Sequence, residues 1–388
     1  MRALSLSESK YRFPWRENNQ FELLVDGDRF FPRMLKAIEA AHHYVLLEMY
    51  LFESGSVADR FIDALQTAAQ RGVAVYLLLD DFGALRLQRH DRERLAHINI
   101  QTVYYNPLRY RNWYRNLQRN HRKLLAVDGE VAFVGGAGIT DQFDPPYHPE
   151  RRWRDTFVEI KGPVVADWQQ LFKETWDRCG PHRLALAMRS PLPISNDQRG
   201  RVAVSSGPTR QENKRALVKR VRRAAHRAWF ATAYFIPSWK IRRALRRAAR
   251  HGIDVRLLLP GAHTDHPAAR HAGRRFYGRL LRDGVRIFEY RSRFLHAKTA
   301  LCDDWVSIGS SNLDRWNLRW NLDADQLVDS GRFAEEVRSM LEQDFEQSRE
   351  YTYDEWRRRP WHRRLLEWFW GRIDLLIEHI GSRHRFRH

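Results

Sequence analysis

Apolar and polar residues follow two different periods along this chain. Nearly continuous apolar runs, such as 44–50 and 73–79, are typical of buried strands, whereas 57–71 repeats apolar residues every three or four positions, as one face of a helix does. Strand-like and helix-like segments alternate. This alternation predicts the α/β class, with a mostly parallel sheet flanked by helices.

The same order of elements occurs twice, which predicts an internal repeat. Each half contains a helix, a strand, a second helix and a second strand, and then continues through another helical stretch to a short strand. The expected elements are a helix that opens at Met34 and segments 44–50, 57–71, 73–79 and 100–105 in the first half, and 216–227, 228–235, 240–251, 253–259 and 285–290 in the second.

A proline-rich segment without aromatic residues, 181–200, favours a linker between the halves. We therefore expect a first half at 1–180, the linker at 181–200, a second half at 201–350 and a basic, aromatic, amphipathic tail at 351–388.

Each half also contains one copy of the motif H-x-K-x-x-x-x-D, in a stretch that reads as a hairpin. The members are His121, Lys123 and Asp128 in the first copy, and His296, Lys298 and Asp303 in the second. On a strand, side chains two residues apart share a face, so each copy sets a titratable imidazole beside a fixed positive charge. Two copies at equivalent places in a repeat favour a catalytic role over two solvated surface pairs.

The return strands of both hairpins end in small residues, at 135–138 and 309–312, which let a ligand approach the backbone closely. Ser310 and Asn312 add polar side chains suited to phosphate oxygens. We count Asp128 and Asp303 among the motif residues, but their place at the turn favours a structural role in turn formation.

A histidine that acts as nucleophile or acid needs its far nitrogen oriented, and a carboxylate commonly does this. Each half offers one on a strand-like segment downstream of its motif: Asp155 in the first half and Asp323 in the second. Either residue could instead be an ordinary surface aspartate.

Charge narrows the choice of partner. The formal net charge of +20 and a pI of about 10.3 indicate a polyanionic partner, either nucleic acid or an anionic membrane. The chain has only two cysteines, which excludes a disulfide framework and is easier to reconcile with a reducing compartment. No apolar window approaches a spanning helix and residues 1–15 lack a signal-peptide core, so any membrane contact is expected at the surface.

These motifs resemble the phospholipase D superfamily, whose hallmark is two H-x-K-x-x-x-x-D motifs that meet in one active site between two similar α/β halves. Nearly the whole chain takes part in the resemblance. Segments 15–19, 47–50, 295–298 and 309–314 are most similar to bacterial cardiolipin synthases that lack N-terminal membrane helices.

The resemblance implies a transfer reaction without a metal or other cofactor. One histidine attacks the phosphorus of a phosphatidyl group to form a phosphohistidine, and the other protonates the departing alcohol. By analogy His121 is the nucleophile and His296 the acid, with the reverse assignment open, while Lys123, Lys298 and Asn312 hold the phosphate oxygens. A second phosphatidylglycerol then accepts the phosphatidyl group, which gives cardiolipin and releases glycerol.

One position departs from the superfamily pattern. Gly138 stands where the second copy has Asn312, so the first phosphate pocket is expected to be less complete. This difference bears on the identity of the substrate more than on the reaction class.

Two basic and aromatic regions, 104–119 and 356–388, suit an anionic membrane or nucleic acid. With the resemblance, they imply a peripheral enzyme on the cytoplasmic face of the bacterial cell membrane, although the tail could instead pack on the domain. The alternatives are a phosphodiesterase or nuclease of the same superfamily, and a basic binding protein without catalysis, which two intact H-x-K pairs argue against.

Overall fold

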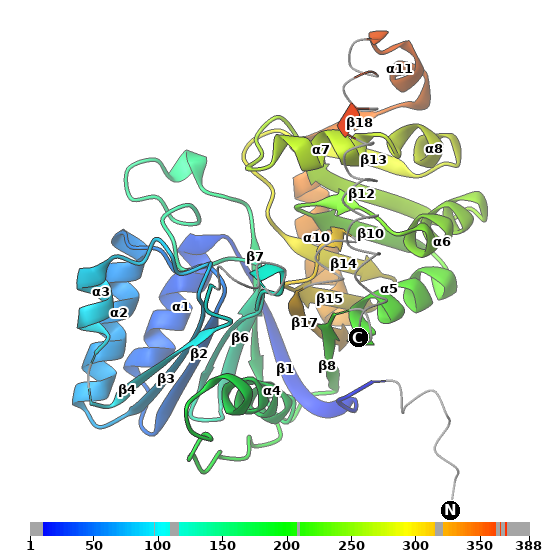
Figure 1. Cartoon of the computed structure of the whole chain (residues 1–388). Coiled ribbons are helices and arrows are strands. Elements are labelled where there is room, and N and C mark those ends of the chain that lie inside the picture. Colours follow the sequence, from blue (N-terminus) through cyan, green and yellow to red (C-terminus); the bar gives the residue numbers. More distant parts are fainter. Residues whose placement is uncertain are drawn as a thin grey trace, which may run out of the picture.

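The computed structural model describes residues 11–96, 98–108, 116–207, 210–314 and 321–361, together with 365, 369 and 370. Helices alternate with strands in part of each half, whereas each H-x-K hairpin adds strands in direct succession (Figure 1). The strands are β1 (Arg16–Val25), β2 (Tyr44–Met49), β3 (Ala74–Asp80), β4 (Ile100–Tyr105), β5 (Lys123–Val127), β6 (Val131–Gly135), β7 (Thr156–Lys161), β8 (Gln198–Ser206), β9 (Arg210–Gln211), β10 (Arg227–Thr232), β11 (Phe235–Ile236), β12 (Asp254–Pro260), β13 (Arg286–Tyr290), β14 (Lys298–Cys302), β15 (Trp305–Gly309), β16 (Leu313–Asp314), β17 (Leu322–Asp329) and β18 (Ser348–Tyr351). The helices are α1 (Gly27–Glu39), α2 (Ser56–Gln70), α3 (Arg89–Arg94), α4 (Val165–Cys179), α5 (Glu212–Arg223), α6 (Trp239–Arg250), α7 (Pro267–Arg274), α8 (Tyr277–Arg282), α10 (Gly331–Glu346) and α11 (Tyr353–Arg358).

One large sheet runs through both halves, in the order β18-β13-β12-β10-β14-β15-β17-β8-β1-β7-β6-β5-β2-β3-β4. The two halves join where β1 pairs antiparallel with β8. The α/β class and the two similar halves are confirmed. The sheet is mixed, however: β2, β3 and β4 are parallel, as are β10, β12 and β13, while the strands of each H-x-K hairpin return antiparallel because a tight turn joins them.

Most of the predicted elements are present, but several boundaries differ. The helix expected to open at Met34 begins at Gly27, and the helix expected from residue 216 begins at Glu212. The helix expected at 216–227 ends at Arg223, because the carboxylate of Asp303 accepts hydrogen bonds from the N–H groups of residues 225 to 227 and holds them outside the helix. The strand expected at 228–235 ends at Thr232. Strand β8 begins at Gln198, inside the segment expected to be a linker. The tail is described only as far as 361 and at three later residues.

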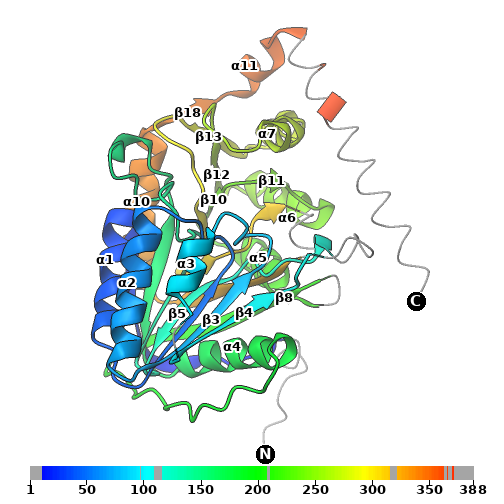
Figure 2. The same cartoon turned by 60° about the vertical axis from the view of Figure 1, so that its left-hand side comes forward.

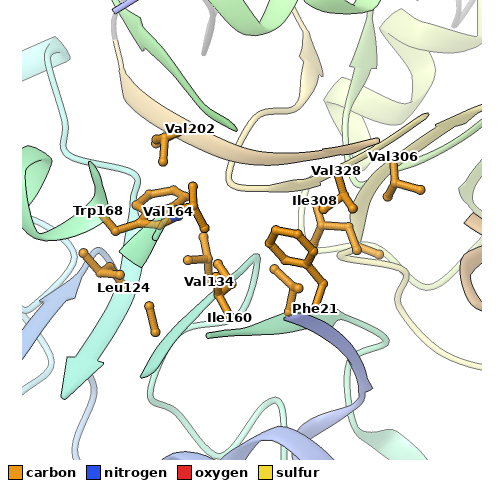
Figure 3. Packing of buried hydrophobic residues seen from close by; sticks show 14 of the residues in the cluster. Phe21, Leu124, Val134, Ile160, Val164, Trp168, Val202, Val306, Ile308 and Val328 are labelled. Carbon is orange, nitrogen blue, oxygen red and sulfur yellow. The ribbon is translucent and has the colours of Figure 1, made fainter. Parts of the chain in front are cut away.

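Helices cover both faces of the sheet. Helices α1 and α2 pack on one face of the first half, and α4 lies on the other (Figure 2). On this second face, α4 and α10 bury one core that draws side chains from both halves. The residues labelled in Figure 3 belong to it: Phe21, Leu124, Val134, Ile160, Val164, Trp168, Val202, Val306, Ile308 and Val328.

Polar contacts also cross from one half to the other. The indole Nε1 of Trp168 donates to Oε1 of Gln326 at 2.8 Å, and the guanidinium of Arg154 forms a two-point ion pair with Asp344 at 3.0 and 2.7 Å. The shared core and these buried contacts hold the edge of the first half against the second. None of the helices in the described ranges is long and apolar enough to span a bilayer.

Candidate active site

The two H-x-K segments approach each other because each pairs, through its backbone, with the opposite half. Asn120 forms an isolated parallel bridge with Leu322, and the N–H of His121 donates to the carbonyl of Leu322 at 2.9 Å. The counterpart bridge joins Arg154 to Leu295, and the N–H of His296 donates to the carbonyl of Arg154 at 2.8 Å. Each histidine is therefore fixed next to a strand of the other half.

These bridges pair the histidines with carboxylates crosswise. Nδ1 of His296 lies 2.6 Å from Oδ2 of Asp155, a residue of the first half. Nδ1 of His121 lies 3.4 Å from Oδ1 of Asp323, a residue of the second half, and 3.3 Å from the carbonyl oxygen of Ser310. Both aspartates are fully buried. Asp155 and Asp323 were expected near the histidines, and the structure brings each to the histidine of the opposite half.

A lysine lies beside each histidine, as the motif predicts. Nζ of Lys123 donates to the carbonyl of His121 at 2.6 Å and lies 5.1 Å from the ring centre of Tyr50. Nζ of Lys298 donates to the carbonyl of His296 and lies 2.8 Å from Nδ1 of that ring. Because an Nδ1–H that donates to Asp155 cannot also accept, the latter contact is a close electrostatic approach rather than a second hydrogen bond.

The two motif aspartates occupy the far ends of their strands, away from the histidines. The carboxylate of Asp128 accepts hydrogen bonds from the N–H groups of residues 42, 43 and 44, and that of Asp303 from residues 225, 226 and 227. Both residues have positive φ angles, 52° and 50°. Their φ angles fit the turn formation that the sequence predicts, and their carboxylates also anchor the hairpins to the segments that lead into the neighbouring strands.

The small residues of the return strands make room for the carboxylates. A Cβ at Gly136 would lie 2.4 Å from Oδ1 of Asp155. The Cβ that Asn would place at Gly138 would lie 2.6 Å from the backbone oxygen and Cβ of Leu51, so this position has no room for the side chain of the superfamily pattern. Close packing therefore accounts for the departure at Gly138.

Of the two predicted phosphate ligands, Ser310 is already engaged. Its hydroxyl donates to Oδ1 of Asp323 at 2.8 Å, which orients the carboxylate beside His121. Asn312 is buried, and its Nδ2 has no hydrogen-bond partner within the described ranges. The phosphate-binding role of both residues stays a prediction.

Both histidines face one cleft of about 640 Å³ between the halves. Its floor carries His121, Lys123 and His296. The remaining wall residues include Tyr50, Leu51, Glu53, Phe82, Leu85, Arg86, Arg119, Phe143, Trp153, Tyr234, Asp265, His266 and Asn321. Three basic side chains, Arg86, Arg119 and Lys123, line the cleft against two acidic ones, Glu53 and Asp265, which suits a phosphodiester. No group of three or more His, Cys, Asp or Glu residues in the described ranges is arranged to hold a metal ion.

Burial and charge set the protonation of the bases in the open cleft. Burial, together with Lys123 and Lys298, lowers the pKa of His121 and of His296 well below the ordinary value. Burial also lowers the pKa of Lys298 to about 8, and burial and the neighbouring lysine lower that of Lys123. Because a bound phosphodiester anion favours the charged forms, it raises the pKa of all four groups.

The carboxylates shift in the opposite direction. Burial raises the pKa of Asp155 to about 6 although the lysines and a backbone N–H oppose it, and burial likewise raises the pKa of Asp323. The contact at 2.6 Å between Asp155 and Nδ1 of His296 couples the two groups, because one proton lies between them.

Several residues of the site were missed in the sequence. Glu48 is buried in β2 and accepts a hydrogen bond from Nδ2 of Asn120 at 2.6 Å, next to His121. The rings of Phe143 and Trp153 lie 5.4 and 5.5 Å from that of His296. Glu48 was detectable as a lone acid in an apolar strand, whereas the aromatic contacts depend on the folding of distant loops.

Comparison with known proteins agrees with this geometry. The sequence profile described as "Cardiolipin synthase, PLD-like domain" matches residues 34–176 and again 217–345, well over half of the chain, and each match contains one H-x-K motif. The chain belongs to this cardiolipin synthase family of phospholipase D-like proteins. The predicted membership of the phospholipase D superfamily, and of its phosphatidyltransferases, is thereby confirmed.

Relatives in the cardiolipin synthase family match over most of the chain. Cardiolipin synthase A of Pseudomonas putida (strain W619) is 36% identical over 354 residues, which are 88% of this chain and 71% of the relative. Cardiolipin synthase A of Pseudomonas aeruginosa (strain LESB58) is 35% identical over 347 residues, 88% of this chain and 70% of the relative.

Solved structures share the fold. The phosphatidylserine synthase of Haemophilus influenzae Rd KW20 aligns with a TM-score of 0.74 and 12% identity, over 95% of this chain and 97% of the other. The polyphosphate kinase of Porphyromonas gingivalis aligns with a TM-score of 0.56 and 17% identity, over 88% of this chain and 48% of the other. At these identities the likeness concerns the fold alone.

Proposed function

We propose that this protein is a cardiolipin synthase, which transfers a phosphatidyl group from one phosphatidylglycerol to another and releases glycerol. The observation that carries the proposal is the pair of buried histidines that face one cleft, each with a carboxylate from the opposite half at its Nδ1 and a lysine beside it. Family membership and 36% identity to a cardiolipin synthase A support the same conclusion.

In the first step His121 acts as the nucleophile. Its lowered pKa keeps the ring neutral, and an Nδ1–H that faces Asp323 leaves Nε2 with the lone pair that attacks phosphorus. His296 is held in its protonated form by the carboxylate of Asp155 at 2.6 Å and by the bound phosphodiester, whereas Asp323 lies farther from His121, at 3.4 Å. The N–P bond forms as the bond from phosphorus to the glycerol oxygen breaks, and His296 gives its proton to that oxygen. Lys123 and Lys298 offset the charge on the phosphoryl oxygens.

In the second step the headgroup hydroxyl of another phosphatidylglycerol replaces the glycerol. His296, now neutral, takes the hydroxyl proton while the oxygen attacks phosphorus, and the N–P bond to His121 breaks. The contact at 2.6 Å between Asp155 and His296 stabilises the imidazolium that forms. Cardiolipin leaves, and both histidines return to their starting states.

We propose further that the protein works as a peripheral enzyme at the cytoplasmic face of the membrane, because an exposed apolar rim borders the cleft. Phe82 and Leu85 line the cleft and are 51% and 54% exposed. Leu108 and Leu117 are 37% and 45% exposed, and the guanidinium of Arg119 lies over the Phe82 ring at 5.6 Å. Apolar side chains next to cations suit an anionic lipid interface.

The tail offers a second apolar stripe in its described part. Trp361, Leu365 and Phe369 are exposed and follow each other at four-residue spacing, as on one helix face, whereas Trp370 packs partly against the core of the second half. The other apolar residues of the predicted membrane helix, and Tyr110, Trp113 and Tyr114 of the first basic region, lie outside the described residues.

The proposal is tested with phosphatidylglycerol vesicles in the presence of a chelator, with the lipid products resolved by mass spectrometry. Cardiolipin with an equivalent of glycerol is expected from the wild type, and neither product from His121→Ala or His296→Ala. Phosphatidic acid alone would identify a hydrolase, and cleavage of nucleic acid without lipid turnover would replace the proposal with a nuclease. Full turnover by either histidine variant would refute the mechanism.

A further inference from the structure

The two walls of the cleft differ at positions that the repeat makes equivalent. Leu51 and Tyr234 each lie two residues beyond the end of corresponding strands, β2 and β10. Leu85 and Asp265 each lie five residues beyond the ends of β3 and β12. All four residues line the cleft. The first half therefore presents two leucines where the second presents a hydroxyl and a carboxylate.

The polar groups of the second wall form a connected cluster. The hydroxyl of Tyr234 donates to Oδ2 of Asp265 at 2.5 Å, and Nε2 of His266 lies 3.7 Å from the same oxygen. The rings of Tyr234 and His266 lie 5.5 Å apart. Within the described ranges Oδ1 of Asp265 has no hydrogen-bond partner, and the carboxylate is only 23% exposed. These contacts hold the cluster in place, and all three of its residues line the cleft.

This cluster lies on the side of His296. Like His296, its residues belong to the second half, and they line the same cleft as that histidine. In agreement with this placement, the negative charge of Asp265 opposes the lowering of the pKa of His296 and of Lys298 that burial causes. The group that His296 protonates is the departing alcohol, so the alcohol lies on this side of the phosphorus.

We propose that Tyr234, Asp265 and His266 form the alcohol subsite of the cleft, which binds the hydroxyl groups of the departing glycerol and then those of the acceptor headgroup. The inference rests on the proposed function and deepens it. The leucine wall opposite takes the apolar part of the lipid.

Two carboxylates line the cleft, and their partners differ. Glu53 pairs with Arg86 at 3.4 Å, whereas Asp265 contacts Tyr234 and His266 and no lysine or arginine of the described residues. Because an ionised carboxylate only accepts hydrogen bonds and repels a phosphodiester, Asp265 is no phosphate ligand. It suits hydroxyl donors, and the vicinal hydroxyls of glycerol can reach both Asp265 and the His266 ring. A cationic alcohol such as ethanolamine would also be attracted to Asp265 but is repelled by Lys123 and Lys298, so the subsite selects an uncharged polyol.

Headgroup exchange tests the subsite directly. The full-length protein is incubated with phosphatidylglycerol vesicles and labelled free glycerol, and both labelled phosphatidylglycerol and phosphatidic acid are measured. We expect the wild type to saturate with glycerol. Asp265→Asn should raise the half-saturating glycerol concentration about ten-fold and lower the ratio of exchange to hydrolysis by a similar factor, as the loss of a hydrogen bond to a charged group predicts. Tyr234→Phe, which removes one hydroxyl, should act in the same direction with a smaller change.

The control is Glu350→Gln, which makes the same charge change at an exposed ion pair with Arg286 and should match the wild type. If Asp265→Asn lowers exchange and hydrolysis equally, or only shifts the pH profile, the carboxylate serves His296 and the subsite is refuted. Labelled ethanolamine that exchanges as well as glycerol would refute the choice of a polyol. A wild type that yields neither product would overturn the proposed function itself.

Discussion

The crosswise pairing assigns one carboxylate to each catalytic histidine, so Asp155 and Asp323 should support different catalytic roles. Asp155 contacts His296, the proposed acid, and Asp323 contacts His121, the proposed nucleophile. Replacing the leaving glycerol with p-nitrophenol removes the need for an acid, because the phenolate leaves without a proton. The two aspartates should then respond differently to the leaving group.

The contact of Asp155 at 2.6 Å is short and buried, so its loss removes a hydrogen bond to a charged group, about 1.5–3 kcal/mol. At about 1.4 kcal/mol for each factor of ten, Asp155→Asn should slow turnover of phosphatidylglycerol by about 10- to 100-fold. With phosphatidyl-p-nitrophenol, the rate of the first-turnover burst of nitrophenolate from Asp155→Asn should lie within about three-fold of the wild-type rate, because this leaving group needs no acid. Asp323→Asn should stay about 10-fold slower with both substrates, because His121 must still attack.

Rapid-mixing absorbance of nitrophenolate measures the burst, and lipid mass spectrometry measures turnover of phosphatidylglycerol. Asp63→Asn, an exposed carboxylate whose side chain is 69% accessible, is the control for the charge change. Rescue of Asp323→Asn but not of Asp155→Asn would reverse the roles of the two histidines. Equal slowing of both variants on both substrates would refute the division of roles.

Four further outcomes are expected. Asp128→Ala should lower the free energy of unfolding by about 2–4 kcal/mol in urea titrations, because it removes a buried carboxylate that accepts three hydrogen bonds from backbone N–H groups. Burial opposes the ionised form of Asp303, but backbone N–H groups lower its pKa overall. The ionised carboxylate therefore stabilises the fold fully above the unfolded pKa of about 3.9, and this stabilisation is lost as pH falls through the folded pKa. The difference in unfolding free energy between the wild type and Asp303→Asn should shrink over that acidic range. The double variant Leu108→Ser, Leu117→Ser should weaken co-sedimentation with anionic vesicles about ten-fold through lost apolar contact. Gly136→Ala should reduce turnover by about ten-fold or more, because its Cβ would displace the carboxylate that orients the acid histidine.

Two of these predictions have a matched control variant. Leu192→Ser removes an equally apolar, 80% exposed side chain from the segment between the halves and should leave vesicle binding intact. Gly331→Ala introduces a Cβ whose nearest neighbour is 3.6 Å away and should retain turnover. If Leu192→Ser weakened vesicle binding as much as the double leucine variant, or Gly331→Ala lowered turnover as much as Gly136→Ala, the role assigned to those residues would be contradicted. A difference in unfolding free energy between the wild type and Asp303→Asn that grows on acidification would contradict the role of the Asp303 carboxylate.

The sequence by itself determined the repeat, the α/β class and the two H-x-K motifs, because these depend on local periodicity and on residue spacing within single hairpins. The place of Asp128 and Asp303 at a tight turn was equally accessible, but their hydrogen-bond donors were not, because the N–H groups of His42 and Ala225 lie 86 and 78 residues away in the sequence. The end of α5 was not accessible, because Asp303, distant in the chain, decides it.

Only the tertiary structure decided which carboxylate serves which histidine. That pairing follows from backbone bridges at Leu322 and Leu295, which join segments far apart in sequence and exist only once the shared core has brought the halves together. The same assembly sets the leucine wall opposite Tyr234 and Asp265. The local sequence pattern determines which side chains a strand carries. Long-range packing determines which groups of the other half those side chains meet, and the chemistry of this cleft depends on these meetings.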